Sequence, residues 1–177
     1  MMKTPSIILG IDPGLANTGW GVIEVLGTKK RPLAYGCITT KAGENIAFRL
    51  KSLHDGMAEV IAKYQPTEVA IESVYFGANV KSALATGEAR GAVLVATSNV
   101  GLQVGEYSPT QIKHALVGEG RASKEQVQYM VRMLLGFDHA PSPDHAADAL
   151  ACALTHAQMR MSPQALANKG TVVALEK

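Results

Sequence analysis

The chain is poor in cysteine. It has two in 177 residues, Cys37 and Cys152, and they lie far apart in the sequence. Because a Cys-x-x-Cys pair and a mixed His and Cys cluster are both absent, the sequence excludes a disulfide-based scaffold and a zinc site built on thiolates. A reducing, cytoplasmic environment is the expectation that follows.

Long apolar runs and a strong charge of one sign are also lacking. The apolar run 6–11 stops at Asp12 and Pro13, which is too short for a secretory signal. No window reaches the roughly 18 apolar residues that a membrane span requires, so we expect no membrane partner. The formal net charge of +2 does not by itself indicate a nucleic-acid partner.

What is present is the composition of an ordinary globular domain, with 47% hydrophobic and 18% charged residues. The length fits one domain that can bury a proper core. We expect this domain to occupy residues 1–160. The segment 161–177 looks like a loosely ordered C-terminal tail.

The periodicity of the apolar residues predicts an α/β fold. Unbroken or alternating β-branched runs predict strands at 6–12, 20–26, 33–40, 68–72 and 102–107. Three- and four-residue spacing, with capping patterns at Ser108 and Ser123, predicts helices over 44–64, 82–100, after 108, after 123, and over 141–156. An antiparallel meander followed by crossovers predicts a five-stranded mixed sheet flanked by helices.

Two acids stand at the carboxyl ends of predicted buried strands. Asp12 closes the first strand and Glu72 the fourth, and open α/β sheets place ligands at such ends. A single acid there can equally be a turn former or a loop cap, and the Asp-Pro-Gly context of Asp12 suits a turn. Glu72 is harder to explain in that way, since glutamate is not a favoured turn residue.

The last predicted helix adds His145 and Asp148, which lie three apart and therefore on one face. A carboxylate within an apolar helix needs a partner, either a divalent cation or a Lys or Arg side chain. Together with Asp12 and Glu72, these residues would form a hard, oxygen-rich site for Mg²⁺ or Mn²⁺. Asp144 is the alternative ligand, although an acid in the first turn of a helix also offsets the helix dipole.

The order and spacing of four segments resemble the RuvC family of Holliday junction resolvases, the crossover junction endodeoxyribonucleases. The segments are "ILGIDPGLANTGWGVI", "AIESVYFGANVKSALATGEARG", "YSPTQIKHALVGEGRASKEQVQYMV" and "HAADALACALTH". The resemblance runs from about residue 7 to residue 156. It implies an RNase H-like fold over 1–160 and metal-dependent, symmetric nicking of two DNA strands of like polarity, in DNA recombination and repair.

Carried over residue by residue, the resemblance places the catalytic acids at Asp12, Glu72 and Asp148. Some members of the family have aspartate at the remaining position, where this chain has His145. The resemblance implies two Mg²⁺ or Mn²⁺ ions at these four residues and products with 5′-phosphate and 3′-hydroxyl ends. Imidazole is a softer ligand than carboxylate, so we expect Mn²⁺ to support activity at least as well as Mg²⁺.

The resemblance also implies residues that hold DNA. Tyr75 and Phe76 follow Glu72, and an aromatic at the Tyr75 position of the family acts as a wedge at the crossover; the alternative is that one of the two rings is buried in the core. Lys113 and Lys124 match lysines that matter for activity in the family. The candidate basic surface also includes Lys81, Arg90, Arg121 and Arg132, most of which could simply be solvated.

Symmetric cleavage predicts a two-fold homodimer on four-way junction DNA. The small-residue helix 82–100 is a candidate interface, or it faces its own sheet. The family also works with the RuvA and RuvB branch-migration proteins. Three other classes of protein are alternatives to a junction resolvase. They are a non-catalytic DNA-binding domain, a general RNase H, and a phosphotransferase of the actin and sugar-kinase type. The last of these needs two lobes.

Overall fold

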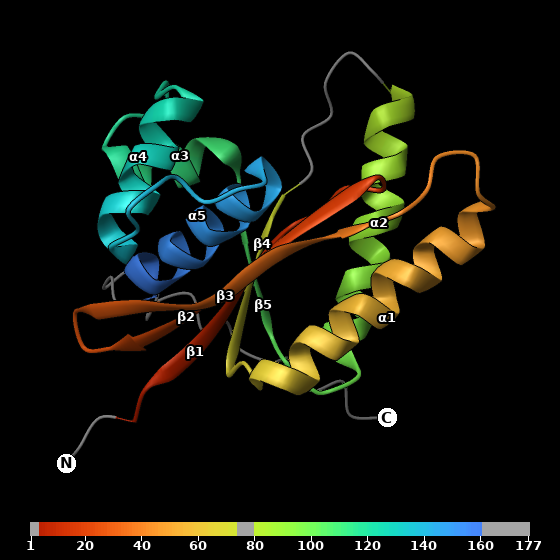
Figure 1. Ribbon diagram of the computed structural model, residues 1–177, viewed down its shortest axis with the longest axis horizontal. Helices are drawn as coiled ribbons and strands as arrows, with labels where there is room; N and C mark the ends of the chain where they lie inside the picture. The colour runs from red at the N-terminus through yellow and green to blue at the C-terminus, as the bar shows by residue number, and fades with distance from the viewer. Residues whose placement is uncertain (1–3, 74–79, 161–177) are drawn as a thin grey trace, which may run out of the picture.

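The computed structural model describes residues 4–73 and 80–160, which form a five-stranded mixed sheet with helices on both faces (Figure 1). The strand order is β3-β2-β1-β4-β5. β1 pairs antiparallel with β2 and parallel with β4, and β4 pairs parallel with β5. The strands are β1 (Ser6–Asp12), β2 (Asn17–Leu26), β3 (Lys29–Thr39), β4 (Glu68–Glu72) and β5 (Val104–Tyr107).

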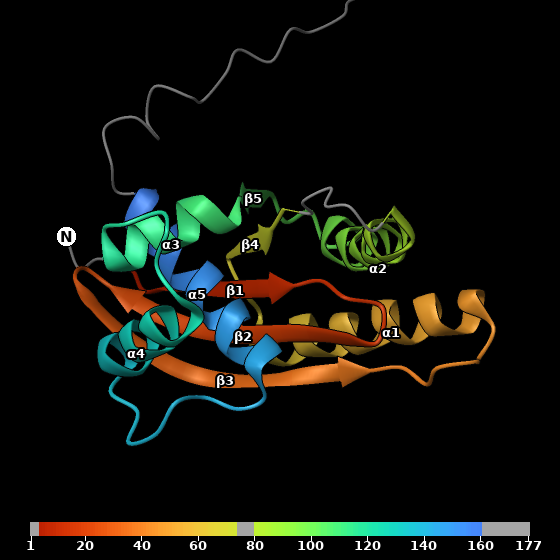
Figure 2. The ribbon, with the colours of Figure 1, turned by 90° about the horizontal axis from the view of Figure 1, so that it is seen from above.

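Helices cover the sheet in two separate layers, as Figures 1 and 2 show from two directions. One face carries α1 (Ile46–Tyr64) and α2 (Val80–Ser98). The other carries α3 (Pro109–Val117), α4 (Lys124–Leu135) and α5 (Asp144–Met159). The predicted α/β class, strand order along the chain and helix positions are confirmed.

Local signals fix the helix ends. The Ser108 hydroxyl accepts from the Gln111 backbone N–H, and the Gln111 side chain accepts from the Ser108 N–H, which completes a capping box before α3. Ser123 forms the same reciprocal pair with Gln126 before α4. α1 ends as expected before a proline, with Gln65 in the left-handed region at φ 46°.

The hairpin of β2 and β3 is longer than the sequence predicts. β2 begins at Asn17 rather than at 20, and β3 begins at Lys29 rather than at 33. The added part of β3 is polar, so its hydrophobic pattern gave no signal; backbone pairing and the ion pair between Arg31 and Glu24 extend the ladder there instead. The Thr18 hydroxyl donates to the Gly14 carbonyl and closes the turn between β1 and β2.

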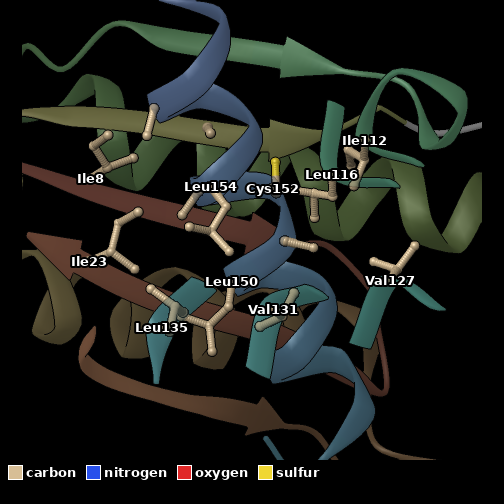
Figure 3. Close-up of a cluster of buried hydrophobic side chains, with 14 of the residues drawn as sticks. Ile8, Ile23, Ile112, Leu116, Val127, Val131, Leu135, Leu150, Cys152 and Leu154 are labelled. Atoms are coloured by element: carbon tan, nitrogen blue, oxygen red, sulfur yellow. The ribbon is translucent and has the colours of Figure 1, made fainter. Parts of the chain in front are cut away.

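The core on the α5 side joins three helices to the centre of the sheet (Figure 3). Leu150, Cys152 and Leu154 of α5 are buried, and they lie between the strand residues Ile8 and Ile23 and the side chains of α3 and α4. A second cluster fills the space between the opposite face and the helices α1 and α2. α5 is therefore held on its sheet face by apolar burial along most of its length.

Glycines allow α5 to lie against the backbone of β1 and β2. A Cβ on Gly10 would lie 2.0 Å from the carbonyl oxygen of Ala149, and one on Gly19 would lie 1.9 Å from that of His145. Gly21 pairs with Gly10 across the two strands, and a Cβ on Gly21 would also clash with the helix, at Leu150. A strand glycine is typical of a site where another backbone approaches closely. These residues set the depth at which α5 sits.

No helix among the residues that the structure describes, 4–73 and 80–160, is long and apolar enough to span a membrane. The predicted tail at 161–177 lies outside the described residues.

We expect Gly10→Ala to destabilise the protein strongly, because the added methyl would meet helix backbone rather than a flexible side chain. The free energy of unfolding should fall by about 3 kcal/mol, the upper end of overpacking penalties. Urea denaturation measures this change. Gly91→Ala is the matched control, since nothing lies within 4 Å of its added methyl and alanine is the better helix former. Equal stabilities for the two variants would contradict the close seating of α5.

Candidate metal centre

Asp12 and Glu72 lie side by side at one edge of the sheet. β1 and β4 are parallel neighbours with Ile11 opposite Ile71, so the residues that follow, Asp12 and Glu72, are adjacent. In each strand the acid lies two residues after one that faces α5, Gly10 in β1 and Ala70 in β4. Because side chains alternate along a strand, both carboxyl groups are on the α5 face.

The first turn of α5 brings an imidazole and a third carboxylate to the same place. His145 Nδ1 lies 2.8 Å from Asp12 Oδ2. One ligand atom from each of Asp12, His145 and Asp148 lies within 4.8 Å of the other two. Glu72 adjoins this group, near enough for the charges of Asp12 and Asp148 to add to the effect of burial in raising the pKa of its carboxyl. The structure therefore brings Asp12, His145 and Asp148 within reach of one ion, with Glu72 next to Asp12 at the same edge of the sheet.

This crowding changes the acidity of Glu72. Burial, followed by the negative charges of Asp12 and Asp148, raises the pKa of Glu72 from 4.5 to about 8. A carboxyl in such surroundings keeps its proton at neutral pH and can donate a hydrogen bond to Asp12. A bound cation would stabilise the buried carboxylate and offset the charges of Asp12 and Asp148, and so would release that proton.

Burial also raises the pKa of the other two acids. Burial raises the pKa of Asp12, although the hydrogen bond with His145 works in the opposite direction. Burial likewise raises the pKa of Asp148, although the nearby Lys124 ammonium acts to lower it. Three acids made less acidic by burial and mutual repulsion, with an imidazole beside them, fit a hard divalent cation.

Asp144 has a different environment from the other acids. Its carboxylate binds Lys124 Nζ at 3.0 Å and accepts a hydrogen bond from Gln128 at 3.2 Å, so both partners come from α4. These hydrogen bonds lower the pKa of Asp144. Asp144 begins α5 after Pro143, the N-cap residue, which makes no side-chain capping hydrogen bond. The Asp144 carboxylate adds a favourable negative charge in the first turn of the helix.

Lys124 links this acidic pair to the metal centre, since its Nζ also lies 3.4 Å from Asp148 Oδ2. Burial works against the Lys124 ammonium, but the carboxylates of Asp144 and Asp148 outweigh that effect and raise its pKa. Lys124 and Lys113 line a cavity of about 230 Å³ together with Glu72 and Asp148. Both predicted lysines therefore stand at the proposed site.

Other predicted residues lie elsewhere. Tyr75 and Phe76 fall at 74–79, outside the described residues, so the proposed wedge is a prediction still. Arg90 pairs with Glu106 of β5 and joins α2 to the sheet. This contact fits the alternative that Arg90 holds the fold, with Glu106 as its partner in place of the expected Glu88.

Two features of the site were not identified from the sequence. Gln128 helps to hold Asp144, and a lone glutamine on a helix gives no signal of that contact. The glycines at 10, 19 and 21 control how closely α5 approaches. Their signal was present, because glycine in a β-strand is unfavourable unless something must come close.

This fold and this site define a class. Carboxylates from neighbouring strands and from a helix meet at the carboxyl edge of a mixed sheet, as in metal-dependent nucleases of the RNase H-like fold. The family model for "Crossover junction endodeoxyribonuclease RuvC" matches residues 8–156. The chain belongs to the RuvC family of crossover junction endodeoxyribonucleases.

Relatives of the same name resemble the chain over most of its length. The RuvC of Azoarcus sp. (strain BH72) is 54% identical over 150 residues, covering 85% of this chain and 81% of the relative. That of Shewanella sp. (strain ANA-3) is 51% identical over 166 residues, covering 94% of this chain and 95% of the relative.

Solved structures share the fold of the chain. The structure described as T. thermophilus RuvC in complex with Holliday junction substrate is 42% identical to this chain, with a TM-score of 0.83. The match covers 87% of this chain and 94% of the T. thermophilus chain. The yeast mitochondrial Holliday junction resolvase shares the fold at 16% identity, with a TM-score of 0.60. The match covers 90% of this chain and 84% of the yeast chain.

The raised pKa of Glu72 predicts how stability depends on pH in the metal-free protein. Between pH 4.5 and about 8 the folded protein holds a proton that the unfolded chain has lost. The stabilisation from this group is complete below pH 4.5 and is lost as pH rises to about 8. The free energy of unfolding should fall by up to about 1.4 kcal/mol per pH unit from this group alone.

Denaturant titrations across that range, with EDTA present, measure the effect. Glu72→Gln should remove this part of the slope, whereas Glu106→Gln should keep it, because the Glu106 carboxylate pairs with Arg90 of α2, away from the metal centre. The same slope in wild type and Glu72→Gln would show that Glu72 does not hold the proton.

Proposed function

We propose that the protein resolves four-way (Holliday) DNA junctions by nicking two strands of like polarity. One observation carries this proposal: Asp12, His145 and Asp148 lie close enough together to hold one ion, and Asp148 also lines a cavity with Glu72, Lys113 and Lys124. The T. thermophilus relative, whose structure was solved with a Holliday junction substrate, supports the choice of DNA.

We propose that these four residues are catalytic and hold two divalent cations, Mg²⁺ or Mn²⁺. Such ions, when bound, supply charge stabilisation at a scissile phosphate and a water of lowered pKa. The chain contributes the ligand geometry. Glu72 gives up its proton on loading, and the contact of His145 Nδ1 with Asp12 keeps the imidazole at the centre. The expected products have 5′-phosphate and 3′-hydroxyl ends.

Lys113 and Lys124 serve as phosphate-binding residues in this proposal. Both line the cavity that contains Glu72 and Asp148, so a DNA phosphate there would meet positive charge beside the ligands. Phosphate contacts of this kind give affinity without reading sequence. Tyr75 and Phe76 are proposed to stack on bases at the crossover, because they follow Glu72 directly in the sequence.

The enzyme is proposed to act as a homodimer in the cytoplasm, in recombination and repair together with RuvA and RuvB. α2 supports a dimer in one respect. Its Ala89 and Val93 are buried against the protein's own core, while Leu84 is 63% exposed. The space beside Gly87 and Gly91 is open. One face of this helix thus packs internally and another is free for a partner.

A cleavage assay on three labelled substrates tests the proposal: a four-way junction, a linear duplex and an RNA–DNA hybrid. Wild type should make paired symmetric nicks in the junction alone. Glu72→Gln should lower the rate by at least about 10³-fold and keep junction binding, because it removes a proposed ligand and no phosphate contact. Glu106→Gln is the control and should cleave normally.

Two outcomes would contradict the proposal. Cleavage of the hybrid in preference to the junction would make the protein a general RNase H. Junction binding with no cleavage in either metal would make it a non-catalytic binding module. The kinase alternative is disfavoured by the fold, since the described residues form one layered unit around one sheet.

We predict that Mn²⁺ supports cleavage at least as well as Mg²⁺, because imidazole at position 145 is a softer ligand than carboxylate. Initial rates at equal metal concentrations measure this directly. His145→Asp should shift the preference toward Mg²⁺. A clear Mg²⁺ advantage in wild type would argue against His145 as a ligand.

A further inference from the structure

A second polar network lies at the opposite end of α5 from the metal centre. The Tyr107 hydroxyl is 2.7 Å from His156 Nδ1, and His156 Nε2 is 3.0 Å from Glu68 Oε2. Arg160 also pairs with Glu68. The network is well shielded, with the His156 side chain only 13% exposed. A Cβ on Gly105 would lie 2.8 Å from His156 Nδ1, so β5 leaves room for this ring.

One protonation state satisfies every contact in the network. Burial lowers the pKa of His156, in spite of the neighbouring Glu68, and burial raises the pKa of Tyr107. With neutral imidazole, the Tyr107 hydroxyl donates to Nδ1 and the Nε2–H donates to the Glu68 carboxylate. Arg160 donates to the other oxygen of Glu68. Directional bonds of this kind fix both the position and the rotation of the ring.

The network joins the same two elements that meet at the metal centre. Glu68 begins β4 and Glu72 ends it, while His156 lies eight residues after Asp148 on α5. Four strand residues span about 13 Å, and eight helix residues span about 12 Å. Because the helix and the strand run in opposite directions, tying His156 to Glu68 places Asp148 level with Glu72.

Tyr107 adds a connection to β5. It lies opposite Glu72 in the parallel register, and its carbonyl accepts a hydrogen bond of 2.9 Å from the Ser73 N–H. The backbone on the carboxyl side of Glu72 is therefore held by the residue whose side chain binds His156. Glu72 is thus connected to Asp148 through its strand pairing with Tyr107, the hydrogen bond from Tyr107 to His156, and the helix α5 that carries both His156 and Asp148.

We propose that Tyr107, His156 and Glu68 are positioning residues that set the register of α5 against β4 and β5, and through it the separation of Asp148 from Glu72. This inference rests on the proposed metal centre. A slip of α5 by one residue would move its ligands by about 1.5 Å, whereas metal ligands tolerate shifts of about 0.2 Å. Apolar packing alone does not specify register so finely, since aliphatic side chains accept small shifts.

The experiment compares Mn²⁺ binding with cleavage in Tyr107→Phe, His156→Asn and wild type. Tyr107→Phe removes one oxygen atom and keeps the ring. Isothermal calorimetry and the EPR signal of bound Mn²⁺ measure the metal site without DNA. Both variants should bind Mn²⁺ about 10-fold more weakly, the effect of losing a residue that orients metal ligands. The Mn²⁺ concentration for half-maximal cleavage should rise equally, with junction affinity unchanged in metal-free buffer.

Thr155→Val is the matched control. Thr155 is buried one residue before His156, and its hydroxyl donates within α5 to the Ala151 carbonyl, so this variant loses a buried hydroxyl without loosening the helix from β4. It should keep the Mn²⁺ affinity of wild type. If Tyr107→Phe and His156→Asn lower the melting temperature but bind Mn²⁺ as tightly as Thr155→Val, the network is structural only and the proposal is wrong.

The test also separates this inference from the proposed function. Weaker Mn²⁺ binding in the variants of a protein that cleaves no junction would reject the function and support the positioning role. Normal junction cleavage with unchanged Mn²⁺ binding in all variants would reject the positioning role alone. If His156→Asn fails to fold, Tyr107→Phe decides the question, because it leaves the imidazole and its bond to Glu68 in place.

Discussion

The contact of α5 with the backbone of β1 and β2 is the constraint on which the site depends. Gly10 and Gly19 leave no side chain between the helix and the strands, so the His145 carbonyl lies where a Cβ of residue 19 would be. Residue 19 in turn pairs with Asp12 across the strands. The same close approach that buries the helix therefore carries the His145 imidazole to Asp12.

That geometry places negative charge where the protein alone cannot neutralise it. Asp12 and Glu72 lie at one edge of the sheet with Asp148 of α5 nearby, and burial raises the pKa of each. Lys124 offsets part of this charge and is itself shared with Asp144. Keeping these acids together costs the metal-free fold stability, and a cation bound among them would restore that stability. Apolar packing of α5 elsewhere makes that arrangement sustainable.

The sequence predicted the fold closely because most elements carry strong local signals. Capping residues, β-branched runs and helical spacing mark nearly every boundary, and β2 and β3 were underestimated only where their ladder is polar. The motif order identified the four proposed ligands, but spacing could not show that they converge. Helix depth and register are three-dimensional properties. They depend on Gly10, Gly19 and the Tyr107–His156–Glu68 network, whose partners lie far apart in the chain.

The most direct test of the proposed metal centre is anomalous diffraction from crystals of the protein grown with Mn²⁺. Data collected near the manganese absorption edge locate the metal without reference to activity. We expect strong anomalous peaks among Asp12, Glu72, His145 and Asp148. His145 should be a ligand, and Asp144 should stay paired with Lys124. Manganese bound at another place, or a peak that leaves Glu72 and Asp148 unliganded, would contradict the proposed metal centre.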